Sequence, residues 1–248
     1  MEVEYRQPGL PVEKINRDKF YADFPRIFKN ITKSQIDDLW DIAMEATKQK
    51  HGTMLVISEQ AASESKRLGK QSFPISPQKL SDAMIPKVTS IDGAILLDRN
   101  ANCHSIGVIL DGLATNKGDP ARGARYNSAI RYYEHISAQA PLILIIISED
   151  GMINLVPDLK PQIKHSQIED AIDDFEKLLE ADELNHKNFN LGMSFFKEIN
   201  FYLTQAECDK INKLRKDIED KFASDLVMMK ILYADLKPDQ EMNDSYYK

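Results

Sequence analysis

The sequence predicts an α/β domain with helical extensions at both ends, and three observations support this fold class. Apolar runs of strand length alternate with helical patterns between residues 50 and 160. From Ser166 onward the strand signal disappears and only helical periodicity is found. Hydrophobic residues make up 42% of the 248 residues. This is enough to bury a sizeable core, so an intrinsically disordered chain is excluded.

The first 50 residues predict an arm followed by one helix. Residues 1–17 are polar and predict an irregular lead-in. The helix is expected from about Ser34 to Lys50, with Thr32 or Ser34 as its cap. Its apolar residues share one helical face: Ile36, Leu39, Trp40 and Ala43.

The middle of the chain predicts a sheet. Thr53–Ser58 (TMLVIS) is nearly continuous in apolar residues, as expected of a strand buried on both sides. Ser76-Pro77 places a capping residue before a proline, which predicts a short helix to about Met84. Further strands are expected at 94–97, 106–110 and 142–147, a helix at 125–137, and an edge strand at 152–156 that Pro157 ends.

The last third of the chain predicts long helices. One stripe comprises Ile168, Ala171, Ile172, Phe175, Leu178 and Leu179. Thr204 and Glu207 match a capping box that opens a second long helix. The stripe of that helix comprises Ile211, Leu214, Ile218, Phe222 and Leu226, and it must pack on the α/β core or on a second subunit. The expected division is 1–49 (arm and helix), 50–160 (α/β domain), 161–236 (helical extension) and 237–248 (a frayed tail).

Composition excludes several classes of function. The chain has 32 basic and 39 acidic residues, a net charge of −7, which disfavours bulk nucleic-acid binding. No apolar run approaches the roughly 18 residues of a membrane-spanning helix, and the first residues do not resemble a signal peptide. Two cysteines make neither a disulfide framework nor a CxxC metal pair. We therefore expect a cytoplasmic protein that binds neither nucleic acid nor membranes.

Two loops carry residues suited to chemistry. In the first, Asp92 precedes the small residues Gly93 and Ala94, so a ligand can approach its carboxylate closely. Such a carboxylate suits a divalent metal or orients a hydroxyl nucleophile. A simple turn is the alternative interpretation, and for Asp-Gly alone it is the commoner one.

The second loop, residues 118–128, runs into the helix expected from about Tyr126. Residues 117–131 carry four basic residues against Asp119, a local charge of 4 − 1 = +3. Backbone N–H groups at a helix start favour an anion, and the forks of Arg122 and Arg125 fit phosphate oxygens. A capped helix start with solvated arginines is an equally good interpretation of this loop alone.

Other candidate residues favour structural roles. Cys103 and His104 are adjacent in a strand, so their side chains should point to opposite faces. Trp40 and Phe195-Phe196 lie in helical patterns and are expected in the core. A solvated helix face is expected for the acidic residues Glu169, Asp170, Asp173 and Asp174.

In order along the chain, four motifs resemble the diadenylate cyclase domain family, which includes the N-terminal domain of the DNA integrity scanning protein. That family has a strand beginning HGA, an Asp-Gly-Ala loop, a Gly-x-Arg-His-Arg-Ala helix start and a strand ending Ser-Glu-Glu. The corresponding segments here are 51–57 (HGTMLVI), 92–94 (DGA), 123–129 (GARYNSA) and 147–151 (ISEDG). The resemblance covers roughly residues 50 to 157.

The resemblance implies a mixed β-sheet flanked by helices and a condensation of two ATP molecules into cyclic di-AMP, with release of pyrophosphate. It also implies a divalent metal, Mg²⁺ or Mn²⁺, and self-association, because each ribose 3′-hydroxyl must reach the α-phosphorus of the other ATP. The motif Arg-His-Arg is Arg125-Tyr126-Asn127 here, and Ile91 stands where the family commonly has His. Arg122 is a candidate for the missing charge.

The resemblance also assigns roles to residues. The catalytic loop would be Asp92, Gly93 and Ala94, with Asp92 as a possible metal ligand. Residues expected at the nucleotide or its phosphates are Arg122, Gly123, Arg125, Asn127, Ser128, Leu96, Ser148 and Glu149.

Three alternatives stand beside an active cyclase. A nucleotide sensor of the same fold could have kept the pocket and lost turnover, as the substitutions at Tyr126 and Asn127 suggest. The changed helix start could alter base or product choice. A helical assembly protein could bind a partner protein through the helices after Ser166.

Overall fold

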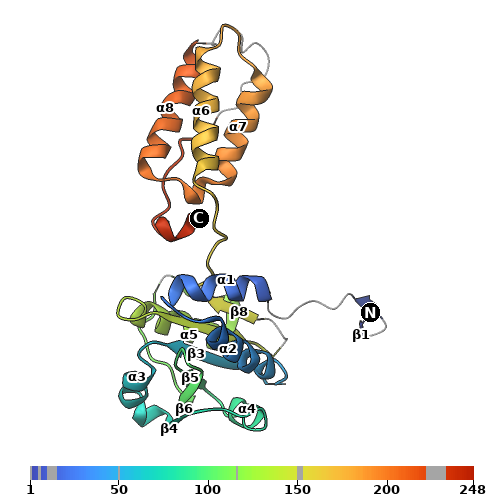
Figure 1. Cartoon of the computed structure of the whole chain (residues 1–248), viewed down its shortest axis with the longest axis vertical. Coiled ribbons are helices and arrows are strands. Elements are labelled where there is room, and N and C mark those ends of the chain that lie inside the picture. Colours follow the sequence, from blue (N-terminus) through green and yellow to red (C-terminus); the bar gives the residue numbers. More distant parts are fainter. Residues whose placement is uncertain are drawn as a thin grey trace. The chain divides into compact units, whose positions relative to one another are not determined.

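The structure is a computed structural model that describes residues 2–4, 7–9, 16–49, 51–115, 117–149, 153–221 and 233–248. The chain divides into two compact units, residues 1–159 and residues 160–248 (Figure 1). The expected boundaries between the arm, the α/β domain, the helical extension and the tail stay a prediction.

The first unit is built on a six-stranded mixed sheet with the strand order β4-β6-β5-β3-β7-β8. The strands are β3 (Thr53–Ser58), β4 (Phe73–Lys79), β5 (Ala94–Leu97), β6 (Asn102–Val108), β7 (Leu142–Ile147) and β8 (Ile153–Val156). β3 and β5 are parallel, and the other neighbouring pairs of this sheet are antiparallel. The predicted α/β fold class with a mixed sheet is confirmed.

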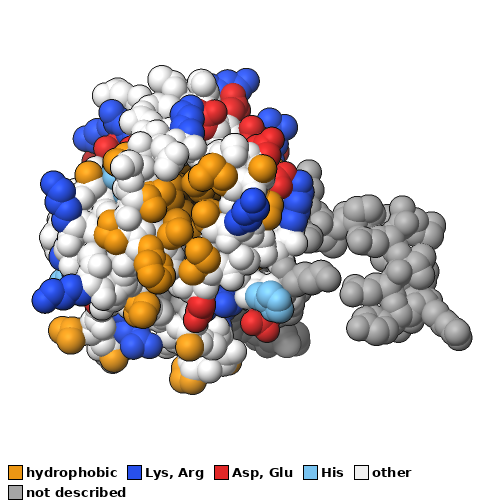
Figure 2. Space-filling model, turned by 90° about the horizontal axis from the view of Figure 1, so that it is seen from below, with side chains coloured by type: hydrophobic (Ala, Val, Ile, Leu, Met, Phe, Trp, Pro, Cys, Tyr) orange, Lys and Arg blue, Asp and Glu red, His pale blue; other side chains and the backbone are white. Residues whose placement is uncertain are grey.

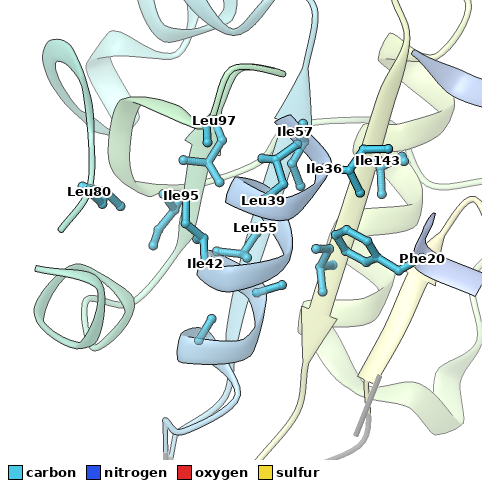
Figure 3. Packing of buried hydrophobic residues seen from close by; sticks show 14 of the residues in the cluster. Phe20, Ile36, Leu39, Ile42, Leu55, Ile57, Leu80, Ile95, Leu97 and Ile143 are labelled. Carbon is cyan, nitrogen blue, oxygen red and sulfur yellow. The ribbon is translucent and has the colours of Figure 1, made fainter. Parts of the chain in front are cut away.

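Helices cover both faces of this sheet. α1 (Arg17–Ile27), α2 (Lys33–Ala46) and α4 (Ile85–Thr89) pack on one face, and α3 (Ala61–Arg67) and α5 (Gly123–Ile136) on the other. Successive strand residues point to opposite faces, so Leu55 and Ile57 join the first core while Met54 and Val56 join the second. Figure 3 shows the first core, where residues of α1 and α2 meet those of β3, β5 and β7.

The short helix predicted from Ser76-Pro77 to Met84 is wrong. Residues 73–79 form β4, which lies at the edge of the sheet and pairs with β6. Prolines are tolerated in an edge strand, where a backbone donor need not be paired, and the register shifts between Pro74 and Gln78. The helix begins only at Ile85, with a proline in its first turn.

Other boundaries differ by a few residues. β6 begins at Asn102 and not at residue 106, α5 spans 123–136, and α2 ends at Ala46. Thr32 is the cap of α2, and with Gln35 it forms a capping box. α1 and α3 were not expected from the sequence. The polar lead-in contains an antiparallel pair of short strands, β1 (Glu2–Glu4) and β2 (Gln7–Gly9). Met152 lies outside the described residues.

The second unit contains α6 (Ser166–Glu180), α7 (His186–Glu198) and α8 (Gln205–Lys221) around one core. Ile211, Leu214 and Ile218 are buried there against residues of α6 and α7. The stripe therefore packs within its own unit, and neither expected partner is needed to bury it. Phe222 and Leu226 lie outside the described residues. The capping box is present, since Thr204 Oγ1 accepts from Glu207 N at 3.3 Å and Glu207 Oε2 accepts from Thr204 N at 2.8 Å.

The expectation of a frayed tail at residues 237–248 is wrong. Tyr246 is 7% exposed, and its carbonyl accepts a hydrogen bond from Ile163 N at 3.1 Å. Tyr247 stands in a β-bridge with Ile163, and Gln162 Nε2 donates to the carbonyl of Ser245 at 2.8 Å. Although the segment is polar in composition, Tyr246 and Tyr247 hold it in place through their contacts with Ile163. In the described part of the chain, no helix combines the length and apolar character needed to cross a bilayer.

Candidate functional site

A cavity of about 890 Å³ lies in the first unit, on the α3–α5 side of the sheet. Its size is typical of small-molecule sites. Part of its wall is apolar and comes mainly from the strands: Met54, Phe73, Val108, Ile109, Leu110 and Ile146. The remaining lining comes from the loop before β5, the loop before α5 with the first turns of α5, and the ends of β6, β7 and β8: Asp92, Gly93, Gly107, Ala121, Arg122, Gly123, Ala124, Arg125, Tyr126, Ser128, Ser148 and Asn154.

The Asp92-Gly93 loop is fixed by contact between two backbones. Gly93 has φ +110°, and a Cβ there would lie 2.6 Å from the carbonyl carbon of Gly107. A larger residue is therefore excluded by both conformation and space. Asp92 is exposed, and its Oδ1 accepts from the N–H of Gly93 at 3.0 Å. Asp92 and Gly93 line the cavity, whereas Ala94 is buried in the core behind it.

Arg125 is seated by the turn that precedes β3. Its Nη2 donates to the carbonyl of His51 at 3.3 Å. Gly52 has φ +61°, and a Cβ there would lie 2.7 Å from Arg125 Nη1 and 2.5 Å from the carbonyl oxygen of Ile147. The sequence did not reveal this role of His51-Gly52. The available signal was a glycine directly before a buried strand.

Arg122 is the N-terminal cap residue of α5, three residues before Arg125. Asp119 Oδ1 accepts from Ala121 N at 2.9 Å and so caps the single turn η2 (Pro120–Arg122) that precedes α5. The Arg122 guanidinium lies 4.3 Å from the centre of the Tyr126 ring and donates to Asn154 Oδ1 at 2.6 Å. Tyr126, which replaces the histidine of the family motif, thus supports an arginine that lines the cavity.

Asn127 braces the loop and does not line the cavity. Its Nδ2 donates to the carbonyls of Asp119 and Gly123, both at 2.8 Å, and its Oδ1 accepts from Asp119 N at 2.8 Å. Ser128, one residue later, lines the cavity. The family's second arginine position is therefore occupied by a side chain whose hydrogen bonds hold the loop in shape.

The remaining predicted residues divide between wall and surroundings. Ser148 lines the cavity at the end of β7. Glu149 is exposed beside it and is not among the lining residues, and the following Asp150 and Gly151 lie outside the described residues. Leu96, expected at the adenine, is 1% exposed and belongs to the core on this side of the sheet. The apolar lining was not identified from the sequence.

The charges around the cavity favour an anion. Its charged lining residues are Arg122, Arg125 and Asp92, two positive groups against one negative. Among the residues that the structure describes, no three His, Cys, Asp or Glu side chains gather to form a metal site. A single carboxylate such as Asp92 is compatible with Mg²⁺, because phosphoryl-transfer sites hold this ion through one or two carboxylates and take the remaining donors from substrate phosphates and water.

The adjacent Cys103 and His104 make no nucleophilic pair. Burial raises the pKa of the Cys103 thiol to about 12. His104 Nε2 contacts Asp98 Oδ2 at 3.0 Å, in the turn between β5 and β6. The Cys103 thiol is buried and the His104 ring contacts Asp98, so both residues have the structural roles that the sequence predicts. The acidic residues of α6 are exposed, as predicted for a solvated face: Glu169, Asp170, Asp173 and Asp174.

Comparisons with known proteins give a family match for part of the chain. No curated protein matches the chain. A crystal structure of a DacA double mutant from Staphylococcus aureus is 16% identical, with a TM-score of 0.40, over 50% of this chain and 81% of that one. A hypothetical membrane spanning protein from Bacillus cereus is 18% identical, with a TM-score of 0.38, over 54% of this chain and 64% of that one. Residues 42–160 match the family model described as DisA bacterial checkpoint controller nucleotide-binding. For residues 42–160, this match confirms the resemblance to the diadenylate cyclase domain family that the four sequence motifs carry.

Proposed function

We propose that the cavity binds ATP and that two such cavities, facing each other in a pair of subunits, condense two ATP molecules into cyclic di-AMP. The observation that carries the proposal is the lining of the cavity. Apolar side chains from β3, β6 and β7 suit a base, and Arg122, Arg125 and Ser128 at the start of α5 suit a triphosphate. Backbone N–H groups at a helix start add to the attraction for phosphate.

The proposed reaction fixes what each cavity must do. The 3′-oxygen of one ATP forms a bond to the α-phosphorus of the other, the bond from that phosphorus to the β-phosphate bridging oxygen breaks, and pyrophosphate leaves with the electron pair. The hydroxyl proton passes to solvent or to a nearby base. The second bond forms in the same way with the roles exchanged, which is why two sites are required.

In this proposal Asp92 and the triphosphate hold a divalent metal, Mg²⁺ or Mn²⁺. Such a metal supplies charge neutralisation at the phosphate and lowers the pKa of an oxygen bound to it. Arg125, seated by His51, binds phosphate oxygens and fixes the orientation of the α-phosphate. Arg122, stacked on Tyr126, supplies a second positive charge from the loop. Asn127 contributes indirectly, by holding that loop against α5.

We further propose the rim of the cavity as the contact surface of the pair. Phe73 is 65% exposed and Ile109 is 64% exposed, and both line the cavity. Ile91 lies nearby, because its Cγ2 and the ring of Phe73 both approach Gly107. Apolar side chains gather in the middle of the face shown in Figure 2. A second copy placed there would cover exposed apolar surface and bring the two cavities face to face.

A second candidate is a nucleotide-binding module without turnover. It is favoured by Asn127, whose hydrogen bonds to the loop occupy the position of a family arginine. Such a module would bind ATP in the same cavity as the cyclase but would form no product. Binding and catalysis must therefore be measured separately.

The test of the ATP site is calorimetric titration with ATP of the wild type, Arg125→Ala and Arg99→Ala. Arg125→Ala removes one charge-assisted contact, worth about 1.5–3 kcal/mol of binding free energy. Arg99 is a matched control, since it pairs with Glu59 at 3.0 Å and is not among the cavity residues. Equal ATP affinity in the wild type and Arg125→Ala would overturn the assignment.

A further inference from the structure

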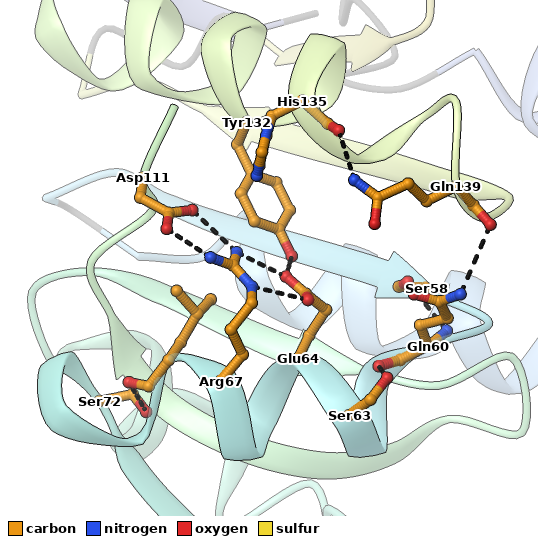
Figure 4. A network of polar contacts seen from close by, with 11 residues as sticks. Ser58, Gln60, Ser63, Glu64, Arg67, Ser72, Asp111, Tyr132, His135 and Gln139 are labelled. Atoms are coloured by element: carbon orange, nitrogen blue, oxygen red, sulfur yellow. Dashed lines mark hydrogen bonds and ion pairs between the residues drawn. The ribbon is translucent and has the colours of Figure 1, made fainter. Parts of the chain in front are cut away.

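One short helix, α3, holds two elements that form the cavity. Glu64 and Arg67 lie one turn apart on α3 and form an ion pair with two hydrogen bonds of 2.8 Å. From this pair, contacts extend to Tyr132 on α5 and to Asp111 in the segment that follows β6 (Figure 4). Neither Glu64 nor Arg67 lines the cavity itself.

The contact with α5 is fully buried. Tyr132 is 0% exposed, and its hydroxyl donates to Glu64 Oε2 at 2.8 Å. Burial and the neighbouring Glu64 carboxylate raise the pKa of Tyr132, so the hydroxyl stays a donor. α5 carries Arg125, Tyr126 and Ser128 at its start, and this bond fixes the helix against α3.

The contact with the segment 109–115 is a two-pronged ion pair. Arg67 Nη1 and Nη2 donate to the two carboxylate oxygens of Asp111 at 2.5 and 2.8 Å. Ile109 and Leu110, the residues just before Asp111, line the cavity. Beyond it, Gly112 lies so close to α5 that a Cβ would be 2.6 Å from the carbonyl oxygen of Arg131. The segment is thus fastened immediately beside its cavity-lining residues.

We propose that Asp111 is a positioning residue of the nucleotide cavity: its ion pair with Arg67 holds the segment 109–115 so that Ile109 and Leu110 form a preordered wall. The proposal rests on the proposed function, because it assumes that ATP occupies the cavity. Without the ion pair, the segment samples positions in which the wall is incomplete. ATP must then select the competent fraction, and its apparent affinity falls by that fraction.

Asp111 is the informative position because its removal leaves no buried charge unpaired. Glu64 is 4% exposed and still has Arg67 and Tyr132 as partners in Asp111→Asn. Asp38→Asn is a matched control. Asp38 forms an ion pair with Lys79 at 2.6 Å, its side chain is 38% exposed against 40% for Asp111, and neither residue of that pair lines the cavity.

The experiment combines ATP titration with a mobility probe on the segment. Leu113 is 84% exposed, and both native cysteines are buried, so Leu113→Cys gives an accessible thiol for a spin label. In Asp111→Asn the label is expected to move faster, and the ATP dissociation constant to rise about three- to tenfold if the competent fraction falls to roughly a tenth to a third. Asp111→Glu should restore much of both, and Asp38→Asn should change neither.

Unchanged label mobility in Asp111→Asn would overturn the proposal, and so would faster motion with unchanged ATP affinity. Equal losses of affinity in Asp111→Asn and Asp38→Asn would also overturn it, as a general effect of losing an acidic residue. A wild-type chain that binds no ATP would instead refute the proposed function. The label would then show by itself whether Asp111 holds the segment, so the two failures are distinguishable.

Discussion

The two units of the chain use buried polar groups very differently. Among the described residues, nine of the ten buried polar or charged residues lie in 1–159, and Arg215 alone lies in 160–248. In the sheet unit some of these groups connect elements: Glu64 joins α3 to α5, and Ser65 joins α3 to β6. In the helical unit the core is apolar apart from that arginine, which bonds Asp235 at 2.6 Å. Buried polar contacts thus join elements of the sheet unit, whereas apolar packing dominates the core of the helical unit.

The largest expected effect is a loss of stability in the helical unit, with ATP binding unchanged. Glu at both Leu214 and Ile218 puts two charges into the apolar core of the helical unit, which should destabilise that unit by about 4 kcal/mol or more. ATP binding should survive, because every lining residue belongs to 1–159. Calorimetric unfolding and ATP titration measure the two effects. Lys213→Glu is the control, since Lys213 is exposed on the same helix. A variant as stable as the wild type would contradict the packing described here.

The next largest expected effect is a loss of product formation, with the stability of the fold unchanged. Asp92→Asn keeps the size of the side chain and removes the charge proposed to hold the metal. Product formation should fall about 10²-fold or more, with an unchanged unfolding temperature. Asp82→Asn, an exposed aspartate in the preceding turn, serves as the control. Undiminished product from Asp92→Asn would leave the Asp-Gly-Ala loop as a turn only.

A smaller effect separates glycines by the space around them. In Gly52→Ala, an alanine must adopt the left-handed conformation of Gly52, and its Cβ would lie too close to Arg125 and the Ile147 carbonyl. We expect a cost of about 1–3 kcal/mol in folding free energy. ATP affinity should fall too, because Arg125 loses its seat. At Gly69 a Cβ would meet only Pro74 at 3.7 Å, so Gly69→Ala should change neither quantity. Equal behaviour of the two variants, by denaturant unfolding and titration, would contradict the seating of Arg125 on this turn.

The smallest effect depends on pH. The Arg67 hydrogen bonds lower the pKa of Asp111 below its ordinary value of 3.8. A carboxyl with a lowered folded-state pKa contributes stability that is present above the unfolded pKa and lost as pH falls through the folded pKa. The stability difference between wild type and Asp111→Asn should therefore be constant near neutral pH and shrink below about pH 4. A difference that persists unchanged at lower pH would show that the carboxylate is not responsible.

The sequence predicted the elements whose pattern is local. The runs 53–58, 94–97 and 142–147 became strands with the predicted bounds, because continuous apolar residues suit a sheet covered on both faces. Residues 73–79 were mispredicted because Ser76-Pro77 favours a helix start locally, while pairing with β6 at the sheet edge decides the outcome. The tail was mispredicted because its tyrosines are anchored by residues 162–163, distant in sequence.

The candidate site divides in the same way. Asp92, Gly93, Arg122, Gly123, Arg125, Ser128 and Ser148 were named from motifs, and the structure brings them to one cavity. Asn127 and Leu96 were named too, but neither lines the cavity. Asn127 forms hydrogen bonds within the loop before α5, and Leu96 is buried in the core. The hydrogen bonds from Arg125 to the His51 carbonyl and from Arg122 to Asn154 join residues 74 and 32 positions apart in the sequence. Short motifs carry no information about such contacts.

Product analysis shows directly whether this cavity binds ATP and joins two molecules of it. The purified chain is incubated with ATP and Mg²⁺ or Mn²⁺, and the products are separated by mass. The expected products are cyclic di-AMP and two pyrophosphates per ring, formed at a rate per subunit that falls on dilution through the dissociation range. ATP recovered unchanged with both metals, from folded protein at concentrations where subunits associate, would contradict the proposed function.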